Sequence, residues 1–426
     1  MIDIRLLRHE PERVREAIIL KQAGDPQLVD RILALDEERR RLQTEADRIR
    51  AELNTLSRQI GQLFQQGQHQ QAEEFRTRTV QLKERLKALE ARLEEIEPEQ
   101  ESLLLQIPNL PHPTVPIGHS PADNRVVYQW GEPRTPEGLQ PHWEIAESLG
   151  IIDFARGAKV TGSGFPFYVG WGARLQRALI AFFLDEANQG GYVEMEPPLL
   201  VNAQSARGTG QLPDKEDLMY VVERDELFLI PTAEVPVTNY YRDELLDEED
   251  LPIRLCAYSP CFRREAGSYG REVRGLNRLH QFDKVELVKI VHPETSYEEL
   301  EGLRQDAERL LQLLGLPYRV LLMCTADLGF TPAKKYDLEV WSPGQGRWLE
   351  VSSVSNFEDF QARRMNLRFR PRDGSRPRFV HTLNGSGLAL PRVVAALLEH
   401  YQHPDGRVRV PEALIPYLGA AWIPAS

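Results

Sequence analysis

Cysteine is scarce in this sequence. Only Cys256, Cys261 and Cys324 are present, and no two of them form a CxxC pair. An odd number of cysteines without paired spacing disfavours both a disulfide framework and a structural zinc site. We therefore expect a protein without zinc and with a cytoplasmic location.

Membrane and secretion signals are also missing. No apolar run approaches the roughly twenty residues that span a bilayer. The opening residues carry charges throughout and lack the apolar stretch of a signal peptide. We expect neither a membrane-spanning segment nor a membrane partner.

Two phosphate-binding signatures are absent as well. The sequence has no GxxxxGK[ST], and no GxGxxG opens a helix after a strand.

The net charge is -12, so any contact with nucleic acid needs local basic patches rather than the field of the whole protein. The 426 residues are enough for two or three domains.

Glycine and proline are nearly absent between about residues 28 and 105, where apolar residues recur every seven positions. This period is typical of a coiled coil. We expect an antiparallel helical hairpin that turns at Gly67, with Pro98 kinking or ending the second helix. One pair of rows is Leu35, Leu42, Ile49, Leu56 and Leu63, with Ile32, Ala46, Leu53 and Ile60, where Arg39 is the one break. A second set is Phe75, Leu82, Leu89 and Ile96, flanked by Ala72, Leu86 and Leu93.

Such an arm has no pocket, so its role is to reach a partner. Composition alone favours an oligomerisation device, because charges on coiled coils are usually solvated. A surface that touches a phosphate backbone is the alternative.

A proline-rich linker at 107–124 follows the arm. We expect an N-terminal domain at 1–110 and a second domain at 111–426.

The second domain mixes strands and helices. Strands joined in hairpins predict an α+β domain with an antiparallel sheet flanked by helices. The expected helices are 173–189, 296–315 and 392–402, and the expected strands are 191–201 with its two prolines, 257–262, 279–290, 318–323, 334–342 and 347–355.

The hairpin between Cys261 and Glu286 is rich in arginine and glycine. Its flanks alternate apolar and polar residues as half-buried strands do, so the arginines at the loop ends project from a sheet face. Guanidinium forks on a rigid sheet suit a bidentate grip on phosphate or carboxylate. Alternation also predicts that Arg278, Phe282 and Glu286 share one face.

Several short strings occur in order along the chain: GYVEMEPPLLV, GTGQLP, PTAE, the FRxE of the hairpin, EVSSVSNFEDFQARR and TLNGSGLALPR. Together with the heptad arm they make the chain resemble bacterial-type seryl-tRNA synthetases, which are class II aminoacyl-tRNA synthetases. The resemblance implies a class II catalytic domain, a tRNA-binding arm at about 28–105, and a homodimer whose interface includes Pro198.

The resemblance also implies the reaction. L-serine is activated with ATP to seryl-adenylate and transferred to the 3′ end of tRNA(Ser), with tRNA(Sec) as a further candidate. Activation needs two anions held together and charge neutralised in the transition state, which arginines and Mg²⁺ supply. The implied catalytic residues are Arg263, Arg392 and Glu350.

The resemblance assigns further site residues. Glu265 would bind the adenine amino group, Phe282 would stack on adenine, and the glycine-rich loop 265–275 would close over ATP or the tRNA end. The implied ATP-binding residues are Arg263, Arg264, Glu265, Phe282, Glu350, Val351, Ser352, Ser353 and Arg392; the serine-binding residues are Thr232, Ala233, Glu234, Arg263, Glu286, Asn384 and Ser386; and the Mg²⁺ ligands are Glu350 and Ser353.

Other readings of these residues stay open. A surface arginine, a core phenylalanine, exposed strand positions, or a helix cap at Asn384 to Ser386 would explain single sites. At the level of the protein, one alternative is a ligase that loads an amino acid onto a carrier protein, although such relatives lack the long arm. Another is a non-catalytic tRNA-binding paralogue, which would be expected to lose Arg263, Glu350 or Arg392.

Overall fold

The computed structural model describes residues 1–213, 217–265 and 274–424. The chain forms two compact units, Ile2–Pro108 and, together with Met1, Asn109–Ser426. Among the described residues, no helix is both long enough and apolar enough to cross a bilayer. The two units are described in turn.

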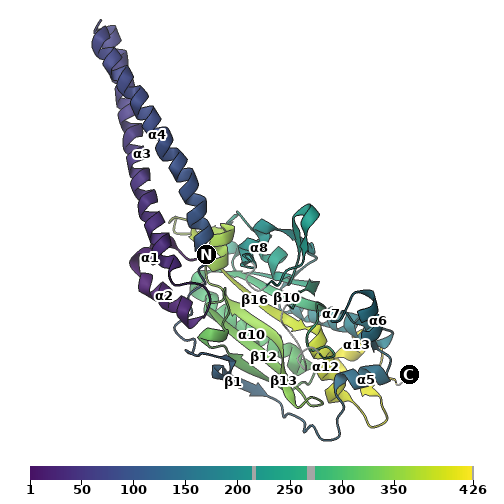
Figure 1. Cartoon of the computed structure of the whole chain (residues 1–426). Coiled ribbons are helices and arrows are strands. Elements are labelled where there is room, and N and C mark those ends of the chain that lie inside the picture. The colour runs from purple at the N-terminus through teal and green to yellow at the C-terminus, as the bar shows by residue number, and fades with distance from the viewer. Residues whose placement is uncertain (214–216, 266–273, 425–426) are drawn as a thin grey trace. The chain divides into compact units, whose positions relative to one another are not determined.

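The first unit is dominated by two long helices. After the short helices α1 (Ile4–His9) and α2 (Pro11–Leu20) come α3 (Leu28–Gln65) and α4 (His69–Leu104), which run side by side (Figure 1). The turn between them contains Gly67, whose φ of 73° is in the left-handed region that glycine adopts freely. The predicted hairpin is confirmed.

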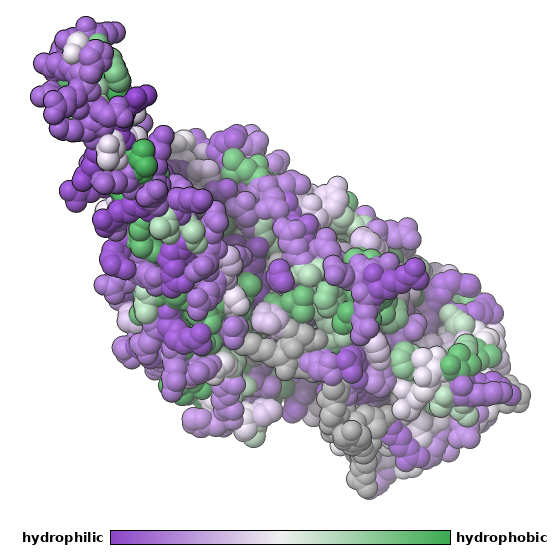
Figure 2. Space-filling model, turned by 45° about the horizontal axis from the view of Figure 1, so that its top comes forward, coloured by the Kyte–Doolittle hydropathy of each residue, from purple (hydrophilic) through white to green (hydrophobic). Residues whose placement is uncertain are grey.

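The heptad residues of α3 and α4 form the seam between the two helices. Leu42 packs with Leu93 and Ile96, and farther along the arm Ile49 and Leu56 pack with Leu82 in a second cluster. Cross-helix ion pairs flank the seam, such as Arg50 with Glu90 at 2.9 Å, but exposed pairs contribute little stability. The arm surface in Figure 2 is mostly hydrophilic, so the buried seam holds the hairpin together.

Pro98 does not end the second helix, because α4 continues through it to Leu104, and the alternative that it kinks the helix stays a prediction. Proline removes one backbone hydrogen bond from the helix, to the carbonyl four residues earlier. Both Pro98 and Glu94 are exposed, so water can bond the Glu94 carbonyl that is freed. The helix therefore does not end at Pro98.

The second unit is built on an eight-stranded sheet in the order β1-β11-β12-β13-β16-β10-β9-β4 (Figure 1). Neighbouring strands are antiparallel except β4 and β9, which are parallel, and the predicted α+β architecture is confirmed. The bounds are β1 (Arg125–Trp130), β4 (Val193–Met195), β9 (Ile253–Phe262), β10 (Gln281–Val291), β11 (Tyr318–Leu322), β12 (Lys334–Ser342), β13 (Arg347–Asn356) and β16 (His381–Ala389).

Three helices share one core with this sheet: α7 (Trp171–Gln189), α10 (Ser296–Leu313) and α12 (Leu390–Tyr401). The remaining elements are α5 (His142–Ser148), α6 (Phe154–Val160), α8 (Ala203–Thr209), α9 (Glu234–Asn239), α11 (Phe360–Met365), α13 (Ile415–Leu418), β2 (Ile152–Asp153), β3 (Phe167–Tyr168), β5 (Leu200–Asn202), β6 (Val221–Val222), β7 (Leu227–Leu229), β8 (Leu245–Asp247), β14 (Arg368–Arg370), β15 (Arg378–Phe379), β17 (Val408–Arg409) and β18 (Trp422–Ile423).

One expectation about strands is wrong. Residues 191–201 form two strands, β4 and β5, which belong to different sheets and are separated by Pro197 and Pro198. Proline cannot donate to a ladder, so the pair of prolines ends one strand before the next begins. The alternative that Asn384 to Ser386 cap a helix is excluded, because these residues lie within strand β16.

Candidate active site

A cavity of about 700 Å³ opens on the second unit, where β10, β12, β13, β16 and the start of α12 meet. Most of the predicted site residues line it. They come from segments that lie far apart in the sequence: Thr232, Glu234, Arg263, Glu265, Arg278, Phe282, Glu286, Glu350, Val351, Ser352, Ser353, Asn384, Ser386 and Arg392.

Two predicted residues do not line the cavity. Ala233 is fully buried in a small apolar cluster with Val237 and Leu255. The side chain of Arg264 points to Asp217, with which it forms an ion pair at 2.7 Å. Much of the predicted closing loop, residues 266–273, lies outside the described residues.

Arg263 follows the last residue of β9, and hydrogen bonds fix both its backbone and its side chain. Its amide donates to the His280 carbonyl at 2.8 Å, and its Nε donates to the Pro231 carbonyl at 3.2 Å. The guanidinium carbon lies 5.1 Å from the centre of the Phe282 ring. The guanidinium is thus held by a carbonyl and an aromatic face, neither of which carries a negative charge.

The argument from strand alternation is wrong for Arg278. This residue lies in a bend before β10, which begins at Gln281, so the period of two does not extend to it. Arg278 nevertheless lines the cavity and forms an ion pair with Glu265 at 3.3 Å. Phe282 and Glu286 do lie in the strand and line the cavity together, as predicted.

A β-bulge brings Glu350 and Ser353 to the same cavity. Residues three apart in a regular strand point to opposite faces. In β13, Ser352 pairs with Leu338 while Glu350 pairs with Glu339, so Val351 is an extra residue that shifts the alternation. Both oxygen-bearing side chains can then line one cavity.

A second bulge lies on β16, just before α12. Ser386 pairs with Glu286 and Ala389 pairs with Lys284, which leaves one extra residue on β16. Leu388 takes up this irregularity with a φ of 73°, a left-handed conformation that costs energy for a branched residue. The strand then passes directly into α12.

Arg392 lies in the first turn of α12 and is anchored by two backbone carbonyls. Its Nε donates to the Asn277 carbonyl at 2.9 Å, and its Nη1 donates to the Glu350 carbonyl at 2.7 Å. The Glu350 carboxylate is farther away, at 3.9 Å. A cation at a helix N-terminus, beside free backbone N–H groups, is a favourable place for an anion.

The deeper end of the cavity is polar and tightly hydrogen-bonded. Thr232 Oγ1 donates to Glu286 at 3.0 Å and accepts from Lys284 Nζ at 3.0 Å, while Lys284 also forms an ion pair with Glu286. Asn384 Nδ2 donates to the other oxygen of Glu286 at 3.2 Å. Lys284 was not predicted from the sequence as a site residue, because lysine is seldom buried. Its spacing of two from Phe282 and Glu286 places it on the same face of the strand.

Glu234 is a buried carboxyl beside this network. Burial raises the pKa of Glu234 to about 7, and the nearby charge of Glu286 acts in the same direction. Gln361 Nε2 donates to Glu234 at 2.7 Å, and Gln361 is itself fixed by Thr382, which donates at 2.7 Å. The sequence offers no signal for this contact with Gln361.

The oxygen donors suit a magnesium ion. Within the described residues, no three His, Cys, Asp or Glu side chains are gathered as a metal-binding group. Glu350 and Ser353 offer two hard oxygen ligands at the cavity wall. Mg²⁺ is usually held by one or two such groups and completed by water and phosphate oxygens, so the donor set fits.

Two family profiles match the chain. One is described as "Seryl-tRNA synthetase N-terminal domain" and matches residues 1–111; the other is "tRNA synthetase class II core domain (G, H, P, S and T)" and matches residues 220–401. A serine–tRNA ligase from Salinibacter ruber is 57% identical over 426 residues, with all of both chains covered. The chain belongs to the seryl-tRNA synthetase family. It is therefore an ATP-dependent aminoacyl-tRNA ligase of class II, as the resemblance predicted.

Other relatives agree with this assignment. A serine–tRNA ligase from Carboxydothermus hydrogenoformans is 54% identical over 424 residues, and 98% of each chain is covered. The crystal structure of seryl-tRNA synthetase from Pyrococcus horikoshii complexed with ATP superimposes with a TM-score of 0.94 at 39% identity, with both chains fully covered. The predicted class II fold with a helical arm is thereby confirmed.

The raised pKa of Glu234 predicts how stability depends on pH. The folded state binds the proton of the Glu234 carboxyl more tightly than the unfolded state does. The protonated carboxyl therefore contributes its full stability below about pH 4.5, and this contribution is lost as pH rises through 7. Glu234→Gln cannot ionise. We expect its unfolding free energy, relative to wild type, to rise by about 3 kcal/mol between pH 4.5 and 8.5.

Urea unfolding at the two pH values measures this difference. Glu132→Gln, a change at an exposed glutamate, is the matched control and should shift stability equally at both. A Glu234→Gln difference that does not change with pH would show that Glu234 titrates normally.

Proposed function

We propose that this chain activates L-serine by in-line attack of the serine carboxylate on the α-phosphorus of ATP, with pyrophosphate as the leaving group. The seryl group then passes to the 3′ end of tRNA(Ser). The observation that carries this proposal is that Arg263, Glu350 and Arg392 line one cavity. In-line displacement needs positioning and charge neutralisation rather than covalent help from the protein.

In this proposal the two arginines bind different phosphates of ATP. Arg263 would bind the α-phosphate and the serine carboxylate, and Arg392 would bind the γ-phosphate from the start of α12. A Mg²⁺ held by Glu350 and Ser353 would neutralise further phosphate charge when bound. Phe282 would stack on adenine.

The remaining members of the proposed ATP site surround this core. Glu265 would accept from the adenine amino group. Val351 and Ser352 line the cavity beside Glu350, which supports their inclusion. Arg264 enters the proposal through its backbone atoms, because its side chain pairs with Asp217.

The polar end of the cavity suits serine. A hydroxymethyl group offers little apolar surface, so discrimination against alanine depends on buried polar groups that would be left unpaired. We propose that Thr232, Glu234, Glu286, Asn384 and Ser386 supply those groups. Ala233, whose side chain is buried elsewhere, would contribute backbone atoms only.

We propose residues 1–110 as a tRNA-binding domain and 111–426 as the catalytic domain. The division into compact units between Pro108 and Asn109 supports this boundary. Some arm cations are engaged in ion pairs across the hairpin, such as Arg78 with Glu52 and Arg85 with Glu45.

Other cations of the arm are available for a phosphate backbone. Within residues 2–108, all of which the structure describes, Arg48, Arg58 and Lys83 are exposed and form no ion pair. Their charge is therefore not offset by a neighbouring carboxylate. This difference supports tRNA binding over the oligomerisation role that composition alone favoured.

The proposal includes a homodimer. Val193 on the edge strand β4 is 62% exposed, and Leu200 on β5 is 41% exposed. An edge strand with exposed apolar residues offers unpaired backbone groups to a partner, and Pro197 and Pro198 suit an interface rather than an internal ladder. tRNA(Sec) is proposed as a second acceptor, and a cytoplasmic location follows from the tRNA substrate.

Serine-dependent exchange of pyrophosphate into ATP tests the activation step. We expect Arg263→Ala to lower this exchange by about 100-fold or more, because a cation that stabilises transition-state charge is lost. Arg264→Ala is the matched control, since it removes the neighbouring guanidinium, which points to Asp217. Exchange with another amino acid but not with serine would remove the substrate assignment, and an equal loss in both variants would remove the role of Arg263.

Aminoacylation tests the arm. The double variant Arg48→Gln with Arg58→Gln should raise the KM for tRNA by about tenfold and leave pyrophosphate exchange unchanged, because two phosphate contacts are lost. The control is Arg78→Gln with Arg85→Gln, whose charges are already paired within the arm. Light scattering would separate the alternative: a change in mass without a change in the KM would make the arm an oligomerisation device.

A further inference from the structure

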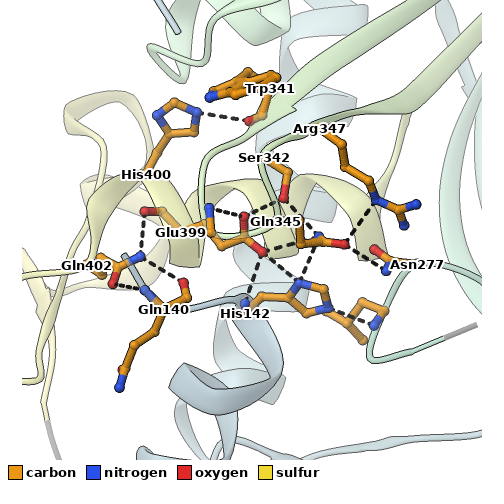
Figure 3. Close-up of polar contacts among 12 residues, drawn as sticks. Gln140, His142, Asn277, Trp341, Ser342, Gln345, Arg347, Glu399, His400 and Gln402 are labelled. Carbon is orange, nitrogen blue, oxygen red and sulfur yellow. Dashed lines mark hydrogen bonds and ion pairs between the residues drawn. The ribbon is translucent and has the colours of Figure 1, made fainter. Parts of the chain in front are cut away.

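A buried carboxylate on α12 holds together several segments next to the cavity. Glu399 accepts hydrogen bonds from the His142 amide at 3.0 Å, from His142 Nδ1 at 2.9 Å and from the Gly344 amide at 3.0 Å. Gln345 and Ser342 also donate to it. Figure 3 shows the side chains of His142, Ser342 and Gln345 converging on Glu399, the first from α5 and the other two from the end of β12 and the turn after it.

This network keeps Glu399 ionised. Burial alone would raise the pKa of Glu399, but hydrogen bonds from His142 and Ser342 hold it below its usual value. His142 and Glu399 are both fully buried. Five donors around one buried carboxylate satisfy its hydrogen-bonding capacity, so the network can act as a rigid support.

The imidazole of His142 connects Glu399 to the cavity wall through a further hydrogen bond. Its Nε2 is 2.9 Å from the backbone amide of Leu276. A backbone amide can only donate, so Nε2 accepts and the ring proton resides on Nδ1, which donates to Glu399. Glu399 therefore selects the tautomer that can hold Leu276.

Gly275 is required for this close approach. A Cβ at this position would lie 2.3 Å from His142 Nε2, and the φ of +65° is one that side chains seldom adopt. Any other residue would push the chain away from the imidazole. The glycine and the histidine together fix where Leu276 and Asn277 lie.

Asn277 links this segment to the arginine at the start of α12. Its side-chain Nδ2 donates to Gln345 at 2.9 Å, and its carbonyl accepts from Arg392 Nε at 2.9 Å. Leu276 and Asn277 line the cavity. A continuous series of hydrogen bonds thus runs from Glu399 through His142 and this segment to Arg392.

We propose that His142 and Glu399 are positioning residues for the ATP end of the cavity, acting through the Asn277 carbonyl on the guanidinium of Arg392. This role rests on the proposed function, because it assigns Arg392 to ATP. The polar end of the cavity, built on Thr232 and Glu286, is bonded through a separate set of partners. The network therefore supports ATP and not the amino acid.

Two substitutions at one position separate this role from general packing. His142→Asn can still donate to Glu399 but has no acceptor at the Nε2 position. His142→Gln can place its side-chain oxygen near that position and restore the acceptor. We expect His142→Asn to raise the KM for ATP about tenfold while the KM for the amino acid stays within about twofold, and we expect His142→Gln to recover most of the loss.

His400 provides the matched control on the same helix. It is a buried imidazole next to Glu399, but its Nε2 bonds to the Trp341 carbonyl at 2.9 Å, and Figure 3 shows it turned away from His142. His400→Asn should leave the KM for ATP unchanged. If His142→Asn fails to fold, Gly275→Ala displaces the same segment from its other side and should raise the KM for ATP in the same way.

Pyrophosphate exchange gives the two KM values, and calorimetric titration with ATP alone gives its Kd without any amino acid. ATP titration still tests the positioning role if serine proves to be the wrong substrate. The proposal is overturned if the KM values for ATP and the amino acid rise together in His142→Asn, if His142→Gln is as impaired as His142→Asn, or if His400→Asn weakens ATP equally.

Discussion

Carbonyl anchoring of two arginines is the interaction on which the site depends. Arg263 is held by the Pro231 carbonyl, and Arg392 by the carbonyls of Asn277 and Glu350. A carbonyl fixes a guanidinium without cancelling its charge, whereas a carboxylate partner would neutralise it. These anchoring bonds therefore leave positive charge available for an incoming anion, although the Glu350 carboxylate lies 3.9 Å from Arg392. Arg263 is positioned by the end of β9 and Arg392 by the first turn of α12.

The arm uses the same residue type for the opposite purpose. Arg50, Arg78 and Arg92 each pair with a glutamate on the facing helix. These pairs leave little net field along the parts of the hairpin that they occupy. Anchoring by carbonyls thus distinguishes Arg263 and Arg392 of the cavity from the arm arginines that are paired with carboxylates.

The parts of the fold that obey a simple period could be predicted from sequence. The heptads gave the arm and its turn at Gly67, and alternation gave β9, β10, β12 and β13. Irregular features could not be predicted, because they arise from pairing between distant segments. The bulge at Val351 depends on the register between β12 and β13, and the break at Pro197 depends on two different sheets.

In the candidate site, too, some residues could be predicted from the sequence and others could not. Most of the residues that the family-like short strings identified line the cavity. The residues that support them carry no local signal: Gln361 meets Glu234 from 127 positions away, and His142 meets Glu399 from 257 positions away. Only the folded chain brings these supports together, so geometry had to supply what motifs could not.

A crystal structure of the full chain with ATP and Mg²⁺ tests the central claim most directly. If the carbonyl-anchored arginines hold one nucleotide, phosphate oxygens of a single ATP will lie about 3 Å from the guanidinium groups of both Arg263 and Arg392. An ATP that reaches only one of the two arginines, or that binds outside this cavity, would contradict the account.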